Sequence, residues 1–268
     1  MALAVSLQLF GLTPANAASV YSNVKYGPAS GSGNLMDIYV PGTGAGPFPA
    51  VLLIHGGGWT KGDKSWFDRD AARLAKVGIV GVSVNYRLAP AAVYPAQLDD
   101  VQAALAWIRA HAFTYKVDPR RIGALGASAG GHLAALLATY GVGSRTSGTR
   151  LSVVAAWSGI YDFMTMPGTG LVDGSKISTF LGCDVTTCPD KWADASPASH
   201  VDPTDPPIYM ANGTAESIPS QQPEDMAAEV GAELIPYQLQ WVPGSQHGTG
   251  YEAQVWAQTV SFLKTYLG

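Results

Sequence analysis

Apolar runs alternate with stretches of helical spacing along most of the chain. Continuous apolar segments of strand length predict buried β-strands at residues 49–55, 78–85, 121–127, 151–157 and 207–212. Residues 234–242 alternate apolar and polar positions more evenly, which is typical of a strand nearer a sheet edge. Apolar positions recur with the helical period at residues 67–77, 98–112, 129–140, 221–230 and 251–267. This order predicts an α/β fold, in which a mostly parallel, twisted sheet carries helices on both faces.

Two regions depart from this alternation. Residues 20–26 and 35–40, which precede the first buried strand, predict a pair of antiparallel strands. Residues 159–207 form the longest irregular segment and contain both cysteines and several prolines. Ligands of open α/β sheets bind at the carboxyl ends of the strands, so this segment is expected to lie over or beside an active site. Because no linker or repeat divides the chain, a single domain over residues 18–268 is predicted.

The first seventeen residues have the features of an export signal. They carry no charge, residues 3–12 form a short apolar run, and Ala15 and Ala17 are small residues at the spacing that a signal peptidase accepts. The run is too short to span a bilayer as a helix. We therefore predict a signal peptide over residues 1–17, with a short buried N-terminal helix as the alternative.

The two cysteines, Cys183 and Cys188, lie close together in the segment CDVTTC. In an exported protein this spacing is typical of a local disulfide that constrains a surface loop. A zinc site is disfavoured because no CxxC pair and no adjacent histidine accompany them. Together with the leader, the pair predicts a secreted or periplasmic protein.

Composition narrows the possible partners. The chain has 268 residues, of which 47% are hydrophobic and only 13% are charged, so it can bury a large core and is not a disordered chain. Its formal net charge of −4 leaves no basic excess to neutralise a phosphate backbone. We therefore expect no nucleic-acid partner and no membrane association after signal removal. The composition leaves the oligomeric state open.

The sequence GASAG at residues 126–130 matches the pattern G-x-S-x-G between a predicted strand and a predicted helix. This pattern places a serine in a tight strand-to-helix turn, where small neighbours are needed to avoid a clash. The helix that follows also directs its N-terminal dipole toward developing negative charge. Ser128 is therefore the predicted nucleophile, and an idle serine in a packing turn is the alternative.

The sequence HGGGW at residues 55–59 follows directly on a predicted strand. Consecutive glycines allow the backbone to approach a ligand closely, as an oxyanion hole requires. A phosphate-binding loop is disfavoured because neither G-K-[ST] nor G-x-G-x-x-G occurs here. We predict that this loop forms an oxyanion hole, with the N–H of Ala129 as a further donor. Trp59 either binds substrate as a wall of the acyl site or belongs to the core.

Five histidines compete for the role of general base. His247 lies in a glycine-rich loop after the last predicted strand, which fits the chain order serine, acid, histidine. His55 and His132 are expected to be structural, since one shapes the end of a strand and the other begins a helix. His111 ends a helix, and His200 has no evident orienting partner in the sequence. His247 is therefore the predicted base.

The sequence identifies the acid that would orient His247 less clearly than it identifies the nucleophile and the base. Glu216 is the first carboxylate after the strand at residues 207–212, and it precedes His247 by enough residues for one helix and one strand. Asp162 follows an earlier strand and is the alternative. The acid would hold the imidazole in the productive tautomer and stabilise the imidazolium.

The motifs HGGGW, NYRLAP, GASAGGH, ASPASHV and PGSQHG occur in this order, and with them the chain resembles the α/β-hydrolase esterases. It is most similar to the bacterial carboxylesterases, acetyl esterases and feruloyl-esterase-like enzymes related to the hormone-sensitive-lipase family. The resemblance implies Ser128 as nucleophile, His247 as base and Gly57, Gly58 and Ala129 as the oxyanion hole.

Two features depart from that family. Glu216 stands where its members usually carry aspartate, and Pro219 comes one residue early. Only residues 18–54 separate the predicted signal from HGGGW, too few for both the opening strands and a cap. The sequence therefore predicts little or no cap domain and an open site for accessible esters.

These features predict a secreted serine carboxylic-ester hydrolase that works without a cofactor or a metal. Its expected substrates are small-molecule or polysaccharide-linked esters with short acyl or aromatic groups, such as acetyl or feruloyl esters of plant polysaccharide. Two alternatives stay open: an amide hydrolase of the arylformamidase type, and a non-catalytic binding protein on a hydrolase scaffold.

Overall fold

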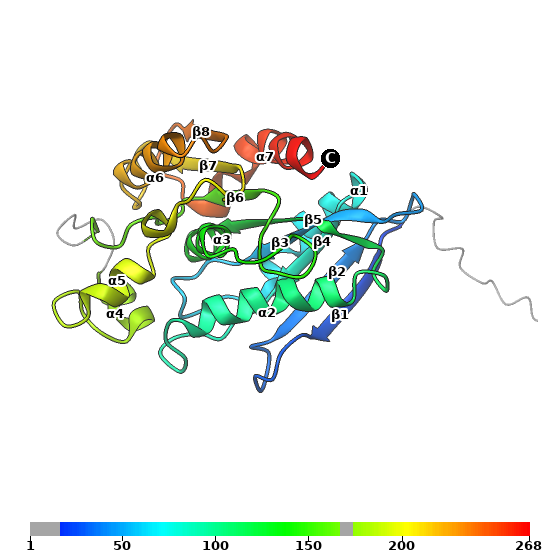
Figure 1. Cartoon of the computed structure of the whole chain (residues 1–268), viewed down its shortest axis with the longest axis horizontal. Helices are drawn as coiled ribbons and strands as arrows, with labels where there is room; N and C mark the ends of the chain where they lie inside the picture. Colours follow the sequence, from blue (N-terminus) through cyan, green and yellow to red (C-terminus); the bar gives the residue numbers. More distant parts are fainter. Residues whose placement is uncertain (1–16, 167–173) are drawn as a thin grey trace, which may run out of the picture.

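The computed structural model describes residues 17–166 and 174–268, so the predicted leader lies outside the described residues apart from Ala17. Eight strands form one sheet in the order β1-β2-β4-β3-β5-β6-β7-β8 (Figure 1). The strands are β1 (Ser19–Lys25), β2 (Leu35–Val40), β3 (Phe48–Ile54), β4 (Val80–Val84), β5 (Val117–Ala127), β6 (Val154–Trp157), β7 (Ile208–Gly213) and β8 (Tyr237–Val242).

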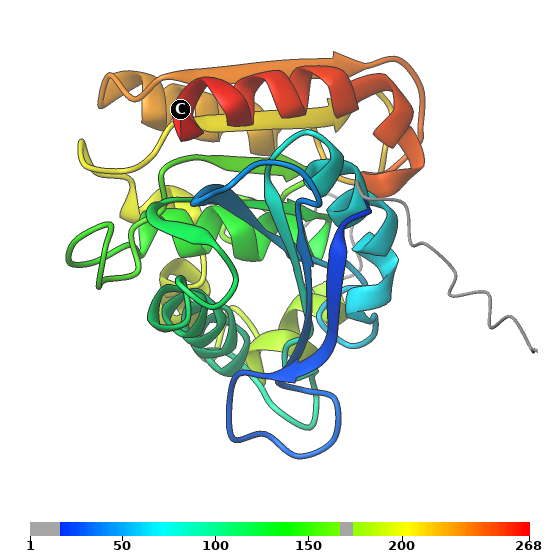
Figure 2. The ribbon, with the colours of Figure 1, turned by 90° about the vertical axis from the view of Figure 1, so that its right-hand side faces the viewer.

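The pairing of these strands confirms the predicted α/β-hydrolase fold. β1 pairs with β2, and β2 with β4, in antiparallel fashion, while the strands from β4 through β3 to β8 all pair in parallel. The strands at the two edges run in clearly different directions (Figure 2), as expected of a right-handed twisted sheet. The parallel part therefore brings the carboxyl ends of its strands to one rim.

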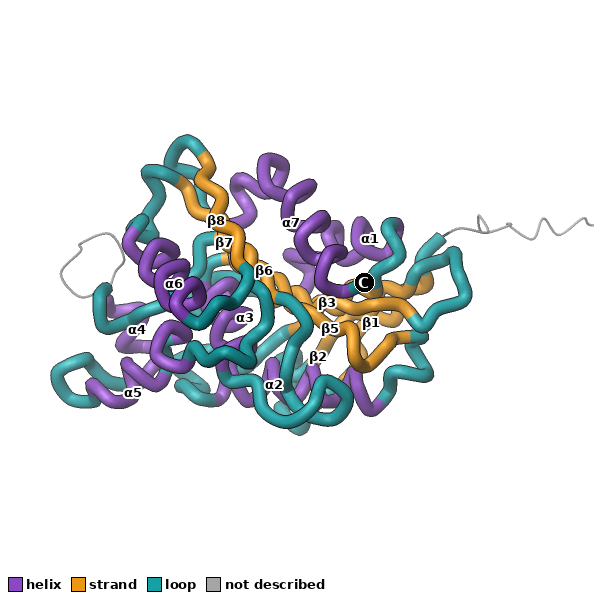
Figure 3. Tube along the Cα trace, turned by 45° about the horizontal axis from the view of Figure 1, so that its top comes forward, coloured by secondary structure: helices purple, strands orange, loops and turns teal. Residues whose placement is uncertain are grey.

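Helices cover both faces of the sheet (Figure 3). One face carries α2 (Ala96–Ala110), α3 (Ala129–Thr139) and α6 (Gln221–Ala232), and the other carries α1 (Asp68–Lys76) and α7 (Glu252–Leu267). Successive residues of β3 serve opposite faces, since Leu52 packs in the core beneath α2 and α3 and Leu53 in the core beneath α1 and α7. Burial on both faces explains why these strands are continuously apolar.

The element boundaries differ modestly from those predicted. β5 begins at Val117, four residues before the apolar run, and β6 begins only at Val154. The 3₁₀ turns η1 (Lys64–Phe67) and η3 (Gly248–Tyr251) precede α1 and α7. None of the helices within the described residues is both long enough and apolar enough to cross a bilayer.

The segment at residues 159–207 is more regular than its sequence predicts, which corrects that expectation. It contains α4 (Gly174–Leu181), α5 (Pro189–Asp194) and the 3₁₀ turn η2 (Pro197–His200). Elements of eight, six and four residues are too short for apolar periodicity to identify them. Figure 1 shows α4 and α5 beside one another at the end of the molecule remote from β1.

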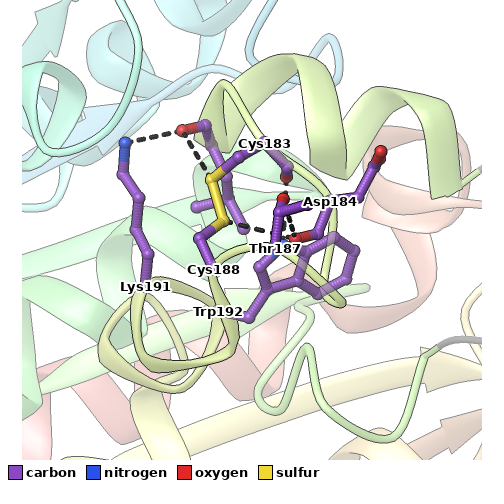
Figure 4. Close-up of a disulfide and its surroundings, with 7 residues drawn as sticks. Cys183, Asp184, Thr187, Cys188, Lys191 and Trp192 are labelled. Carbon is purple, nitrogen blue, oxygen red and sulfur yellow. Dashed lines mark hydrogen bonds between the residues drawn. A yellow bond between two sulfur atoms is a disulfide. The ribbon is translucent and has the colours of Figure 1, made fainter.

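The predicted disulfide is present and closes the loop between α4 and α5 (Figure 4). Cys183 and Cys188 form the bond with their Cα atoms 6.2 Å apart. Two side chains of α5 fasten the same loop: Lys191 Nζ donates to the Leu181 carbonyl at 2.6 Å, and Trp192 Nε1 donates to the Cys183 carbonyl at 3.1 Å. The bond thus joins the two short helices of this segment.

Candidate active site

Ser128 occupies the turn between β5 and α3, at the carboxyl end of a central strand. Its backbone is left-handed, with φ 57° and ψ −124°, which a non-glycine residue adopts only under constraint. The Ser128 N–H donates to the carbonyl of Trp157 at 2.8 Å, which ties the turn to β6. The strained conformation is the one expected for a nucleophile held above the end of a sheet.

The glycines around Ser128 are required by close backbone approach. A Cβ atom on Gly126 would lie 2.0 Å from the carbonyl oxygen of Gly130, and one on Gly130 would lie 1.9 Å from that of Ile54. No side chain fits at such distances, so the turn can exist only with glycine at both positions. The sequence pattern at residues 126–130 therefore has a direct steric cause.

The HGGGW loop lies against this turn. A Cβ on Gly56 would approach the Ala127 carbonyl to 2.8 Å, and Gly57 and Gly58 have φ values of 109° and 60°. Both glycines line the same pocket as Ser128. Ala129 opens α3, so its N–H belongs to the first turn of a helix, where amides lack intrahelical acceptors. The three predicted oxyanion donors are thus grouped around the serine turn.

His247 and Glu216 come from two different loops and form a pair. His247 Nδ1 makes a hydrogen bond to Glu216 Oε2 across the carboxyl ends of β7 and β8. The Glu216 side chain is fully buried, whereas 35% of the His247 side chain is exposed. When Nδ1 donates to a carboxylate, Nε2 is left as the acceptor in the neutral imidazole. His247 and Ser128 line the same pocket, so the imidazole whose Nε2 accepts hydrogen bonds lies beside the serine.

Ser158 is a residue that the sequence analysis missed. Its hydroxyl donates to Glu216 Oε1 at 2.9 Å and accepts from the Gly248 N–H at 2.7 Å. The Gly213 N–H also donates to Glu216 Oε1, at 2.6 Å, and the hydroxyl of Tyr251 lies 2.7 Å from Ser158 Oγ. One buried serine thereby connects the carboxylate to the residue after His247. No sequence pattern marks it, because its partners are 58 and 90 residues away.

The pocket at this rim has a volume of about 480 Å³. Ser128, His247, Gly57 and Gly58 line it, and so does Lys176 of α4, which places the segment at residues 159–207 beside the site as predicted. Further lining side chains that the sequence analysis did not select are those of Thr60, Lys61, Trp66, Phe67 and Thr249. The structure thus brings the predicted nucleophile, base and oxyanion glycines to one cavity.

Trp59 belongs to the hydrophobic core and does not line the pocket, so its prediction as a substrate-binding residue is wrong. Only 2% of the residue is exposed, and its ring stacks on Phe180 with the centroids 4.5 Å apart. Its indole N–H donates to His132 Nδ1 at 3.2 Å. The Trp59 backbone is left-handed, with φ 58°, where the side chain turns into the core. Trp66, not Trp59, is the tryptophan that lines the pocket.

The other histidines have structural partners. His55 donates to the Gly56 carbonyl and stacks on Tyr86, and burial lowers its pKa. His132 donates through Nε2 to the Ala195 carbonyl at 2.8 Å, and complete burial lowers its pKa to about 4. Neutral, buried imidazoles of this kind support packing.

Asp162, the alternative acid, lies in a different environment. Its Oδ1 accepts from the backbone N–H of Met164 at 2.8 Å, and its own N–H donates to the side chain of Gln222. The carboxylate thus caps a local turn, while Glu216 contacts the histidine. Among residues 17–166 and 174–268, no cluster of three or more histidine, cysteine or acidic side chains is placed to hold a metal ion.

Comparison with known sequences gives a consistent picture. The family model described as BD-FAE matches residues 36–230. The chain is 32% identical over 220 residues to the probable carboxylic ester hydrolase LipM and 29% identical over 261 residues to the esterase LipQ, both of Mycobacterium tuberculosis. These matches cover 75% and 91% of this chain, but 49% and 61% of the two relatives. The chain therefore spans about half to three fifths of the length of these curated relatives.

A solved structure matches over nearly its whole length. It is a truncated form of a carbohydrate esterase from gut microbiota, which superposes with a TM-score of 0.85 at 26% sequence identity. The match covers 95% of this chain and 98% of that one. The similarity in fold therefore extends over nearly the whole of both chains.

Proposed function

The chain belongs to the BD-FAE family, and on that premise we propose that it is a serine ester hydrolase with Ser128, His247 and Glu216 as its catalytic triad. The observation that carries the proposal is the pairing of His247, which lines the same pocket as Ser128, with a fully buried Glu216. LipM and LipQ, named as a probable carboxylic ester hydrolase and an esterase, support the reaction class.

In the first half of the reaction, Ser128 Oγ attacks the carbonyl carbon of the ester. Its proton passes to Nε2 of His247, and the buried Glu216 carboxylate stabilises the imidazolium that forms. The carbonyl oxygen becomes negative and receives hydrogen bonds from the N–H groups of Gly57, Gly58 and Ala129. The tetrahedral intermediate then collapses, and the alcohol leaves with the proton from His247.

In the second half, water hydrolyses the acyl-enzyme. His247 removes a proton from the water, whose oxygen attacks the acyl carbon within the same oxyanion hole. Collapse releases the acid, and Ser128 regains its proton from His247. In both halves of the reaction His247 transfers the proton, while Glu216 and the oxyanion N–H groups stabilise the charges. Ser128 forms and releases the acyl group.

The proposed substrates are small-molecule or polysaccharide-linked esters with short acyl or aromatic groups, including acetyl and feruloyl esters. The structural relative named as a carbohydrate esterase supports this class. The pocket's own lining, with backbone glycines, two threonines and Trp66, suits an ester that has both polar and flat apolar parts. The Cys183–Cys188 disulfide supports the proposed export of the protein, since such bonds persist in oxidising compartments.

Hydrolysis of p-nitrophenyl acetate and butyrate by wild type and Ser128→Ala tests the reaction class. Loss of a triad nucleophile removes several orders of magnitude in kcat, about 10⁶ in a well-studied protease. We expect Ser128→Ala to retain the wild-type free energy of unfolding and to lose nearly all turnover. Covalent labelling by a fluorophosphonate should occur in wild type and be absent in Ser128→Ala.

Two results would favour one of the alternative functions over a serine ester hydrolase. Absence of both turnover and fluorophosphonate labelling in the wild type would favour a non-catalytic binding protein. Labelling together with faster cleavage of an N-formyl arylamide than of either ester would favour an amide hydrolase of the arylformamidase type.

A further inference from the structure

Resting on the proposed ester hydrolysis, we propose that the pocket selects esters that carry a carboxylate, which the ammonium groups of Lys61 and Lys176 bind. The two lysines reach the site from separate segments, one just after the HGGGW loop and the other in α4. Both line the pocket that contains Ser128. Such a preference would define the substrate class more narrowly than ester hydrolysis does.

The side chains of the two lysines lie over the predicted oxyanion glycines. A Cβ atom on Gly57 would lie 3.2 Å from Cγ of Lys61, and one on Gly58 would lie 3.4 Å from Cδ of Lys176. The aliphatic stems therefore pack against the loop that would hold the ester carbonyl, and both residues are exposed. An ester bound at Ser128 would lie within the reach of both flexible side chains.

The positive charge at this rim is not balanced from within the described chain. Neither lysine forms an ion pair with a described carboxylate, and none of the described residues that line the pocket is an aspartate or a glutamate. Lys64, which lies three residues after Lys61, is different, since it pairs with Asp37 at 2.7 Å and is buried. Glu216 forms no ion pair with either lysine, since its buried oxygens accept hydrogen bonds from His247, Ser158 and Gly213. An anionic substrate group would supply the missing charge.

Trp66 gives the proposed ligand a second feature. Its side chain lines the pocket although 54% of the residue is exposed, so a flat apolar surface accompanies the two ammonium groups. Aromatic faces bind sugar and aromatic rings, and cations fix carboxylates. The ligand class that fits both is a carboxylate attached to a ring, such as an acidic sugar or an aromatic acid in ester linkage.

Matched pairs of esters test this selectivity. Para-acetoxybenzoate and para-acetoxybenzamide differ in the charge on the leaving group, and methyl para-carboxybenzoate and methyl para-carbamoylbenzoate differ in the charge on the acyl group. In at least one pair, kcat/KM of the wild type should favour the anion by about 5-fold or more at low salt. The advantage should disappear near 1 M salt, where the screening length falls to about 3 Å.

Lysine variants assign the effect to the two side chains. Lys61→Met and Lys176→Met keep the aliphatic stem and remove the charge, so each should lower kcat/KM for the anionic ester about 2- to 5-fold, and both together about 10-fold. In all three variants the loss on the neutral ester should be smaller than the loss on the anionic ester. Lys176→Arg should retain the preference, and Lys264→Ala, at an exposed lysine of α7, should change nothing.

A binding measurement separates this inference from the proposed reaction. The Ser128→Ala variant should bind the anionic ester more tightly than its neutral partner, and the two Lys→Met changes should abolish the difference in Kd. Turnover of neutral esters without any anion preference in kinetics or binding would overturn the carboxylate site and leave the esterase proposal intact. Equal losses on neutral and anionic esters would also overturn it, since the lysines would then act on the oxyanion itself.

Discussion

The serine turn and the acid–histidine pair lie at the same rim but are held in different ways. The turn at residues 126–130 is fixed by backbone contacts too close for any side chain at Gly126 or Gly130. Glu216 and His247 are joined instead by side-chain hydrogen bonds that connect loops after β6, β7 and β8. The turn is thus held by close backbone contacts among its own residues and with β3, whereas the pair is a side-chain hydrogen-bond network across the fold.

This difference separates the effects expected of mutations. A side chain added at Gly126 or Gly130 of the turn forces the backbone to move, so it should reduce the stability of the whole sheet centre. Changing the network alters charge and orientation at the histidine while the surrounding backbone stays in place. Damage to the turn should therefore appear in unfolding, and damage to the pair in catalysis.

Among the changes that separate the turn from the pair, the largest expected effect is the loss of catalysis in Glu216→Gln. An amide cannot stabilise the imidazolium as a carboxylate does, and a matching change in a well-studied serine protease lowers kcat about 10⁴-fold. We expect kcat on p-nitrophenyl acetate to fall by about 10³ to 10⁴. Glu224→Gln, at an exposed position of α6, should behave as wild type. If Glu216→Gln kept kcat within tenfold of wild type, Glu216 would not be the triad acid.

The next effect is on stability, in Gly130→Ala. The new Cβ would lie 1.9 Å from the carbonyl oxygen of Ile54, so helix α3 would have to shift away from β3. The free energy of unfolding should fall by at least about 3 kcal/mol, as for severe overpacking. It can be measured by urea denaturation.

Gly250→Ala is the matched control, because its Cβ would meet only Cβ of Gln246, at 3.7 Å. This control should change the free energy of unfolding by no more than about 1 kcal/mol. Equal stability of Gly130→Ala and Gly250→Ala would refute the steric account of the turn.

The same contrast explains what the sequence could predict. The fold followed from apolar runs, because strands buried on both faces must be continuously apolar. The serine turn was predictable because the motif that marks it lies within five adjacent residues, although the carbonyl that excludes a side chain at Gly130 belongs to Ile54. Glu216 and His247 were selected by their positions after predicted strands, and the structure places them in contact.

Other features depend on neighbours that are distant in the sequence. Ser158 becomes important only when β6, β7 and the loop after β8 are brought together. The two alternatives for Trp59 could not be decided from the sequence, because its burial depends on packing against Phe180 of α4. Helix α4 is itself too short for its periodicity to be recognised.

A smaller effect is expected when the network loses Ser158. Ser158→Ala removes a hydrogen bond to Glu216 and leaves the buried Gly248 N–H without its acceptor. Loss of one buried partner corresponds to about 1–3 kcal/mol, so kcat should fall about 5- to 100-fold while KM changes little. Fluorophosphonate labelling of Ser128 should slow in parallel.

Ser158→Gly provides the comparison, because Ser158 has φ 50° and glycine would relieve the left-handed strain. Equal losses of kcat in both variants, despite different free energies of unfolding, would assign the effect to the hydroxyl. Recovery of wild-type kcat in Ser158→Gly would show that catalysis does not require the hydroxyl.

The smallest effect is expected in Asp162→Asn, which tests whether carboxylates near the rim are interchangeable. Asp162 accepts the Met164 N–H, and an asparagine oxygen can accept the same bond, so stability should change by less than about 1 kcal/mol. Because Glu216 is the carboxylate bound to His247, kcat should stay within about twofold of wild type. In the double variant with Glu216→Gln, the effects should add, since Asp162 has no share in the network. A further fall in kcat that occurs only in the double variant would mean that Asp162 substitutes for the lost Glu216 carboxylate. His247 could then be served by either of two carboxylates, although the structure shows it bound to Glu216.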